Sequence, residues 1–135
     1  RTPNPNLCVQ ILKADPRGHA ADIRGMALIM VDVIKAKAIE TLNKINQLLK
    51  GGGNKKTLSD CADNYKLGIL ISDVQQATDP LQLGDPKFAE DGASDSAIEA
   101  DSCEDGCNGK SPLTNENNGM CNVANVARAI IRNLL

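Results

Sequence analysis

The sequence predicts an all-α fold, and three observations indicate it. Tyr65 and Phe88 are the only aromatic residues and tryptophan is absent, so the core must be built from Leu, Ile, Val, Met and Ala, most of which favour helices. Apolar residues recur at spacings of three and four over long stretches. Clusters of Gly and Pro divide these stretches into segments of helix length. We expect an antiparallel up-down-up-down four-helix bundle with a short N-terminal helical extension, stabilised by a disulfide bond.

The 135 residues are enough for one domain, which we divide into an N-terminal extension, residues 1–18, and a four-helix bundle, residues 19–135. Prolines near the start of the extension prevent a regular helix there. A short helix is expected to follow over residues 7–13 and to end at Asp15-Pro16-Arg17-Gly18.

The first bundle helix is predicted to be long and to stop at Gly51-Gly52-Gly53, because glycine favours non-helical conformations. The spacing of its apolar residues defines one face of a helix. This face is formed by Ile23, Ala27, Met30, Ile34, Ala38, Leu42, Ile45 and Leu49. A second helix is predicted from about Leu58 to Ala77, with Thr57 as its N-cap and Asp60 in its first turn.

Asp85-Pro86 predicts the start of a third helix, with Asp85 as N-cap and Pro86 at the first helical position, where its missing N–H costs little. This helix would run toward Cys103 on a face of small residues that permits close packing. The small residues are Ala89, Ala93, Ala97 and Ala100. A polar loop is expected from Gly106 to Asn118, followed by a last helix. Its predicted apolar residues are Val123, Ala127, Ile130 and Leu134.

The balance of charge argues against some classes of partner. The chain has 15 basic and 17 acidic residues, which gives a net charge of −2 and no broad cationic field for a phosphate backbone. No apolar run approaches the roughly 20 residues that span a bilayer. We expect neither a nucleic-acid partner nor a membrane partner.

We find no pattern that predicts a catalytic, metal or cofactor site. His19 is the only histidine, and its neighbours favour a surface position over a role in a catalytic triad. Carboxylates cluster between Glu90 and Asp105, where a hydrolase could keep an acid and base pair. At helical spacing such residues more often form a solvated face, and their spacing does not match a calcium-binding loop. We expect that the protein is not an enzyme.

Five cysteines in a chain this short favour disulfides and an oxidising compartment, which predicts a secreted protein whose leader has been removed. Phe88 leaves two interpretations open. From spacing alone a core position is favoured. The alternative is that the turn fixed by Pro86 holds Lys87 and Phe88 outward as a cation and an apolar anchor for a partner.

Short motifs spread along nearly the whole chain carry a family resemblance. They are Asn4-Pro5-Asn6-Leu7-Cys8, Ala27-Leu28-Ile29-Met30-Val31-Asp32, Ile34-Lys35-Ala36-Lys37-Ala38, Asp60-Cys61, Asn64-Tyr65, Ser102-Cys103-Glu104-Asp105 and Arg128-Ala129-Ile130-Ile131-Arg132-Asn133-Leu134-Leu135. Their shared order resembles the plant invertase and pectin methylesterase inhibitors. The resemblance implies a four-helix bundle that inhibits an enzyme by binding it, without a cofactor or turnover.

The segment from Asp85 to Asp91 is similar to the invertase-inhibitor branch, in which a Pro-Lys-Phe motif enters the active-site cleft of acid invertase. By this resemblance Pro86 shapes the turn, Lys87 meets the acidic groups that cleave sucrose, and Phe88 packs at the rim of the cleft. The expected partner is a plant acid invertase of the cell wall (apoplast) or the vacuole. The alternative is a pectin methylesterase inhibitor on the same scaffold.

The resemblance also implies a pattern of disulfides. One disulfide of the family maps onto Cys61 and Cys103, and another would join Cys8 to a cysteine upstream of Arg1, so that the chain is expected to be truncated. Cys107 and Cys121 depart from the family pattern. Two pairings stay open for them: a disulfide between Cys107 and Cys121, or a disulfide between one of them and Cys8.

Overall fold

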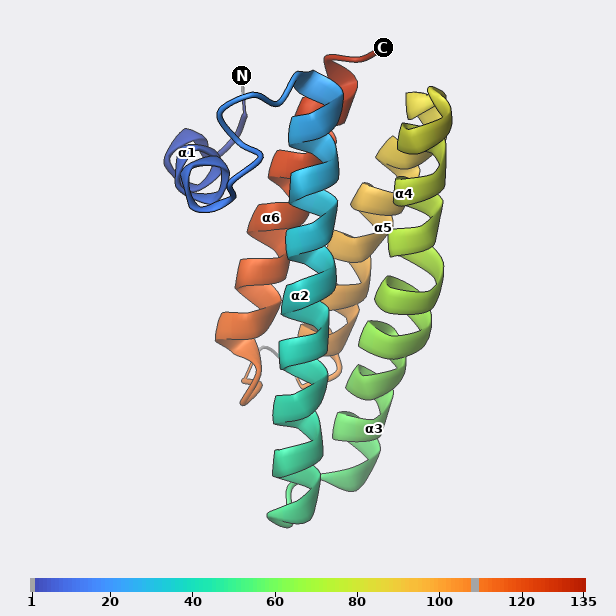
Figure 1. The fold of residues 1–135 in the computed structure, drawn as a ribbon. Coiled ribbons are helices and arrows are strands. Elements are labelled where there is room, and N and C mark those ends of the chain that lie inside the picture. The colour runs from blue at the N-terminus through green and yellow to red at the C-terminus, as the bar shows by residue number, and fades with distance from the viewer. Residues whose placement is uncertain (1, 108–109) are drawn as a thin grey trace.

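The structure, a computed structural model, describes residues 2–107 and 110–135, and its elements are all helical (Figure 1). In chain order they are α1 Pro5–Ala14, α2 Ile23–Lys50, α3 Lys55–Asp63, η1 Asn64–Asp73, α4 Val74–Leu83, α5 Pro86–Asp105 and α6 Thr114–Arg132. Because α3, η1 and α4 follow one another without a break, they act as one long helix. With α2, α5 and α6 this helix forms the bundle, and the predicted antiparallel four-helix fold is confirmed.

The two helices at the N-terminal end begin at side-chain caps. Asn4 accepts a hydrogen bond of 3.3 Å from the N–H of Leu7, and Asp22 accepts one of 2.7 Å from the N–H of Gly25. The short helix α1 lies across the upper parts of α2 and α6 (Figure 1). It contains no fully buried residue, so it contributes to the edge of the core rather than to its centre.

The second helix of the bundle begins earlier and ends later than the sequence pattern predicts. Its N-cap is Asn54, whose side chain accepts from the N–H of Thr57 over 3.1 Å, so the assignment of Thr57 as N-cap was wrong. The helix continues past Ala77 and through Pro80 to Leu83. Burial of Leu81, which is 1% exposed, offsets the backbone hydrogen bond lost at the proline.

The middle of this helix is a π-helix, η1, from Asn64 to Asp73. Its inward residues Tyr65, Ile69 and Asp73 are all buried and recur every fourth position. Because π-helical hydrogen bonds reach one residue further along the chain than α-helical ones, this segment alters the rotational register between α3 and α4.

The small-residue face predicted for α5 is present. Ala89, Ala93 and Ala100 are buried, and Ala97 is partly buried. Gly92 lies on the same face and permits the closest approach, since a Cβ atom built there would stand 2.7 Å from the backbone oxygen of Asp73. The absence of side-chain bulk therefore lets α5 pack directly on the backbone of its neighbour.

The polar loop is shorter than predicted, because α6 begins at Thr114 and residues 114–118 are helical. Residues 108 and 109 of that predicted loop lie outside the described part of the chain. Asn117 is buried in the first turns of α6, where its amide is hydrogen bonded on both sides. Within the described residues, no helix is long and apolar enough to cross a membrane.

Candidate functional site

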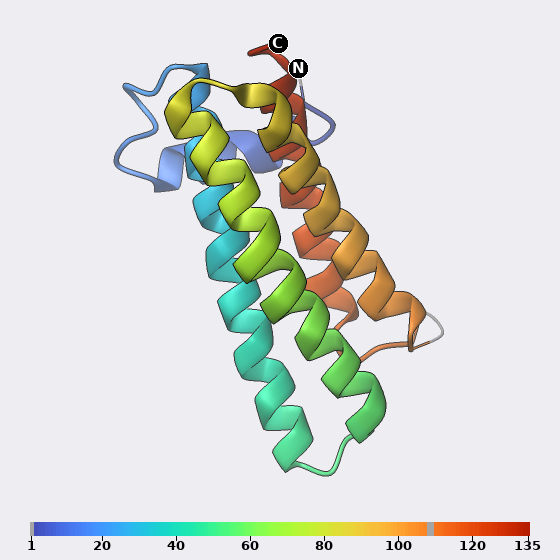
Figure 2. The ribbon, with the colours of Figure 1, turned by 90° about the vertical axis from the view of Figure 1, so that its right-hand side faces the viewer.

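The turn between α4 and α5 lies at the end of the bundle that also holds both chain termini (Figures 1 and 2). Gly84 ends α4 with a φ of 82°, a left-handed conformation that glycine adopts without steric cost. The N–H of Asp85 donates to the carbonyl of Pro80 over 2.8 Å and closes the turn. Pro86 then fixes the first residue of α5, so a two-residue link reverses the chain.

Asp85 occupies the predicted N-cap position, although its side chain makes no capping hydrogen bond within the described residues. Pro86 is partly buried, whereas Lys87 and Phe88 are exposed, Phe88 to 54%. The core position that spacing favoured for Phe88 was therefore wrong. Ala89, which is 0% exposed, fills the core at this level and turns the preceding two side chains outward.

The tip, which we define as Leu83 to Phe88, is supported from beneath by α2 and α6. Arg24 donates from Nη2 to the carbonyl of Gln82 over 3.0 Å and so ties the end of α4 to the start of α2. Glu90 forms an ion pair of 2.6 Å with Arg132 and a longer one of 3.5 Å with Arg128. These contacts hold both ends of the turn against the bundle.

Lys87 is a cation without an intramolecular partner in the part of the chain that the structure describes. Phe88 is adjacent and presents an aromatic ring to solvent. A small cavity of about 150 Å³ lies under the turn. It is lined by Arg24, Leu81, Gly84, Pro86 and Leu134. The tip therefore presents one free positive charge and an exposed aromatic ring on a braced turn.

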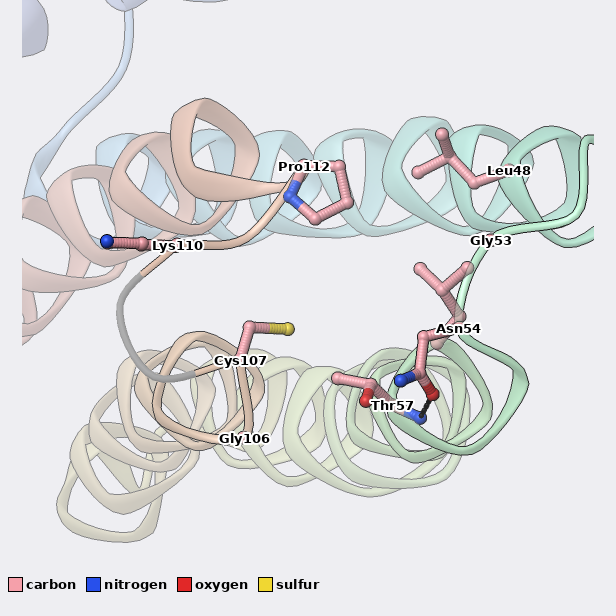
Figure 3. Close-up of a pocket in the computed structure, with 9 residues that line it drawn as sticks. Leu48, Gly53, Asn54, Thr57, Gly106, Cys107, Lys110 and Pro112 are labelled. Carbon is pink, nitrogen blue, oxygen red and sulfur yellow. Dashed lines mark hydrogen bonds between the residues drawn. The ribbon is translucent and has the colours of Figure 1, made fainter.

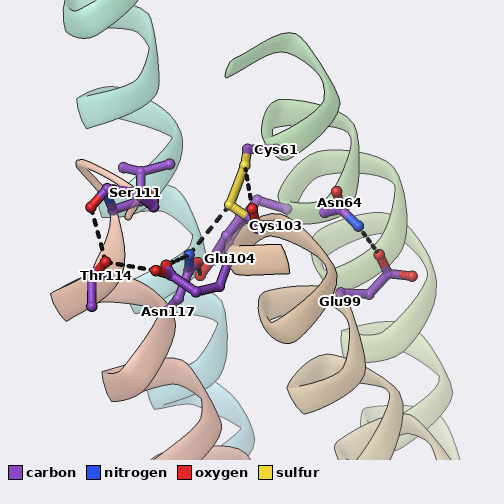
Figure 4. The surroundings of a disulfide bond; sticks show 10 residues. Cys61, Asn64, Glu99, Cys103, Glu104, Ser111, Thr114 and Asn117 are labelled. Carbon is purple, nitrogen blue, oxygen red and sulfur yellow. Dashed lines mark hydrogen bonds between the residues drawn. A yellow bond between two sulfur atoms is a disulfide. The ribbon is translucent and has the colours of Figure 1, made fainter. Parts of the chain in front are cut away.

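A disulfide joins Cys61 and Cys103, the pair implied by the family resemblance (Figure 4). It links α3 to the last turn of α5, and the two Cα atoms are 4.8 Å apart. Both cysteines are buried, at 1% and 2% exposure. The bond lies toward the other end of the bundle from the tip, so it stabilises the scaffold and makes no part of the exposed turn.

A buried polar network surrounds this disulfide (Figure 4). The hydroxyl of Tyr65 donates to Oδ1 of Asn117 over 2.6 Å, and Nδ2 of Asn117 donates to Glu104 over 2.8 Å. The hydroxyl of Thr114 donates to the other oxygen of Glu104 over 2.6 Å. Burial raises the pKa of Tyr65 well above its usual value. Because each group is satisfied by its neighbours, the network fixes the start of α6.

Cys8, Cys107 and Cys121 carry free thiols, so neither of the pairings left open for them is present. Cys107 lines a pocket of about 310 Å³ between the α2–α3 turn and the end of α5 (Figure 3). Cys121 donates to Asp101 over 3.2 Å, and burial together with this carboxylate raises its pKa to about 12. Burial also raises the pKa of Cys8, whose upstream partner stays a prediction.

Three of the carboxylates between Glu90 and Asp105 are held by other side chains. Glu99 accepts from the amide of Asn64 over 2.6 Å, and Glu90 and Glu104 have the separate partners given above. His19 lies exposed in the segment before α2. No group of His, Cys, Asp or Glu within residues 2–107 and 110–135 is arranged to hold a metal ion.

A buried carboxyl group also lies away from the tip. Asp73, at the end of η1, is 4% exposed, and its Oδ2 has no hydrogen-bond partner among the described residues. Burial, reinforced by the nearby carboxylates of Asp95 and Glu99, raises the pKa of Asp73 to about 7. The spacing of apolar residues does not predict the burial of Asp73, because the position of Asp73 on the helix depends on the π-helix.

The fold and the braced tip define a small, disulfide-linked helical bundle with an exposed turn at one end. Residues 1–130 match the family described as plant invertase/pectin methylesterase inhibitor, and the chain belongs to this family. This confirms the resemblance seen in the sequence. The family is described by its inhibitors, so the match places the chain in an inhibitor family.

Two relatives represent the two branches of the family. The chain is 48% identical, over 96% of its length, to "Cell wall / vacuolar inhibitor of fructosidase 1" of Arabidopsis thaliana. It is 31% identical, over 81% of its length, to "Pectinesterase inhibitor" of Actinidia deliciosa. The chain spans 63% of the length of the first relative and 60% of the second.

The fold is shared with a solved structure. The crystal structure of a mutant form of a pectin methylesterase inhibitor from Arabidopsis superposes with a TM-score of 0.81, covering 97% of this chain and 90% of that chain. The two sequences are 24% identical, so this likeness establishes the helical fold alone.

Proposed function

We propose that this protein inhibits a plant acid invertase (β-fructofuranosidase) by binding the enzyme through the α4–α5 tip and occluding its sucrose-cleaving site. The observation that carries the proposal is the placement of Pro86, Lys87 and Phe88 on a braced turn, with the lysine and the ring exposed. The 48% identity to a cell wall / vacuolar inhibitor of fructosidase supports it. The same relative supports secretion to the cell wall (apoplast) or to the vacuole.

The chemistry of the tip suits such a target. Enzymes that cleave glycosidic bonds use paired carboxylates, which create an acidic cleft. The unpaired ammonium group of Lys87 gives a charge complement to that cleft, and Phe88 gives an apolar contact at its rim. Pro86 and the hydrogen bond from Asp85 to Pro80 fix the turn in advance, which lowers the entropy cost of binding. Occlusion needs no cofactor and consumes no substrate.

The second candidate is inhibition of a pectin methylesterase. The relative from Actinidia deliciosa favours it, because its name places a pectinesterase inhibitor within the same family at 31% identity. This alternative would not require the motif formed by Pro86, Lys87 and Phe88. The two candidates therefore differ in their dependence on the tip.

A paired inhibition assay at mildly acidic pH separates the two candidates. Purified protein is titrated against a plant acid invertase and, in parallel, a plant pectin methylesterase. We expect loss of sucrose hydrolysis and unchanged pectin demethylation. Loss of pectin demethylation alone would replace the proposal with the second candidate, and inhibition of neither enzyme would remove both.

A double variant tests the site. Lys87→Ala with Phe88→Ala should weaken inhibition of invertase by at least about tenfold while helix content and thermal unfolding stay nearly unchanged. The matched control is Lys66→Ala with Leu67→Ala, an exposed lysine and apolar pair on η1. Equal inhibition by both double variants would show that the tip is not the binding site.

A further inference from the structure

Among the described residues, Leu83 is an apolar side chain that lies outside the hydrophobic core and is not packed against it. It is 84% exposed, whereas the other exposed large hydrophobic residues of the described chain range from 43% to 66%. It is the last residue of α4, and this helix packs into the core through Ala77 and Leu81 instead. Neither helix propensity nor the C-cap at Gly84 requires a large apolar residue at this position.

We propose that Leu83 is a further contact residue of the inhibitory surface, pairing with Phe88 so that two apolar side chains flank Lys87; this inference rests on the proposed function. Gly84 and Asp85 are the whole link between the two helices, which keeps Leu83 within three residues of Pro86. Leu83 and Phe88 belong to different helices on the two sides of the turn, and both project into solvent.

The backbone at Leu83 is fixed before binding. The carbonyl of Gln82, one residue earlier, accepts from Arg24, and Asp85, two residues later, donates to Pro80. An exposed leucine on a rigid backbone loses little conformational entropy when a partner covers it. Most of the free energy gained by burying its side chain therefore contributes to affinity. Isolated exposed leucines on flexible segments lack this property.

The chemistry predicts that Leu83 and Lys87 affect different rate constants of binding. A charge in an acidic cleft steers the approach, so it acts mainly on the association rate and on the salt dependence of binding. An apolar contact forms only after docking and excludes water from the rim, so it acts mainly on the dissociation rate. Leu83 is therefore expected to prolong the complex without affecting how fast it forms.

The test measures binding of the full chain to a plant acid invertase by surface kinetics at two salt concentrations, alongside inhibition of sucrose hydrolysis. Leu83→Ala should raise the dissociation rate and the inhibition constant by roughly tenfold, with an unchanged association rate. Leu83→Met should restore most of the affinity, because it keeps the apolar volume. Leu67→Ala, a leucine that is 53% exposed on η1, serves as the matched control and should leave both rates unchanged.

The outcomes distinguish this inference from the proposed function. Inhibition by the unaltered chain together with a Leu83→Ala dissociation rate equal to that of Leu67→Ala would overturn the inference alone. A change confined to the association rate would also overturn it. Absence of invertase inhibition by the unaltered chain would overturn the proposed function and, with it, the contact assigned to Leu83.

Discussion

Nε of Arg132 lies 2.6 Å from Oε1 of Glu90, and this ion pair joins the last turn of α6 to the beginning of α5. Glu90 is only 17% exposed and receives a second, longer contact from Arg128. It lies two residues after Phe88, so this cluster fixes the helix that carries the exposed motif. The bundle thus holds its tip through a contact between segments far apart in the sequence.

Glu90→Gln should lower the free energy of unfolding by about 1 kcal/mol, because it leaves two arginines without their carboxylate in a partly buried site. Urea unfolding followed by circular dichroism measures the change. Lys56→Ala is the control, since the ion pair of Lys56 with Asp60 is 3.5 Å long and its lysine is 89% exposed. Equal losses in the two variants would show that Glu90 contributes no more than a surface charge.

Reduction of the disulfide between Cys61 and Cys103 should destabilise the bundle. The bond closes a loop with a sequence separation of 42, for which the chain-entropy model gives about 4 kcal/mol. The expected result is a lower thermal midpoint in reductant, and the same loss in the variant Cys61→Ala with Cys103→Ala. Identical midpoints with and without reductant would contradict this prediction.

The sequence pattern predicts the bundle well where packing depends on regular spacing. The stop at Gly51 appears at the end of α2, whose bounds are Ile23–Lys50. Its predicted apolar face is buried or partly buried from Ala27 to Ile45, whereas the prediction was wrong at Ile23, which precedes the packed part of the helix and is 43% exposed. Asp85-Pro86 likewise begins α5 as expected. In these places local chemistry and burial favour the same structure, so a pattern is sufficient.

Other boundaries depend on contacts that spacing cannot reveal. The start of α6 at Thr114 is fixed by hydrogen bonds to Glu104, which lies on another helix. The second helix passes through Pro80, and Leu81, the next residue, is buried. Phe88 is exposed because Ala89 fills the core at this level. Spacing alone favours the larger apolar residue, Phe88, for the core position. Tertiary packing decided each of these cases.

Gly92→Ala should destabilise the protein by roughly 1–3 kcal/mol, because overpacking forces neighbouring elements apart. The added methyl group would lie 2.7 Å from the backbone oxygen of Asp73 and 2.9 Å from the backbone nitrogen of Ala77, neither of which can move freely. Gly119→Ala on α6 is the matched control, because its nearest neighbour is 3.9 Å away. That variant should be neutral or more stable by up to about 1 kcal/mol. Denaturant unfolding of both variants measures the difference, and equal shifts would refute the close approach at Gly92.

Asp73 contributes stability that is greatest in acid. Its pKa is raised from 3.8 to about 7 in the folded protein, by burial first and then by Asp95 and Glu99. Below pH 3.8 both the folded and the unfolded chain hold this proton, and the stabilisation is fully present. Between these two values the folded chain keeps a proton that the unfolded chain has lost, so the free energy of unfolding falls as pH rises. The fall is about 1.4 kcal/mol per pH unit and levels off above about pH 7.

Unfolding by urea between pH 4 and pH 8 measures this slope for the unaltered protein, Asp73→Asn and Asp91→Asn. Asp73→Asn removes the titrating group while keeping the shape, so its stability should change less with pH and should exceed that of the unaltered protein at pH 8. Asp91 is exposed on α5, and its variant should keep the slope. The same slope in all three proteins would assign the pH dependence to other groups.

The expected slope matches the proposed working site. An inhibitor of an acid invertase in the cell wall or vacuole would act at a pH at which Asp73 is protonated. The protonated carboxyl group is neutral, so its Oδ2, which has no hydrogen-bond partner among the described residues, needs no positive charge beside it.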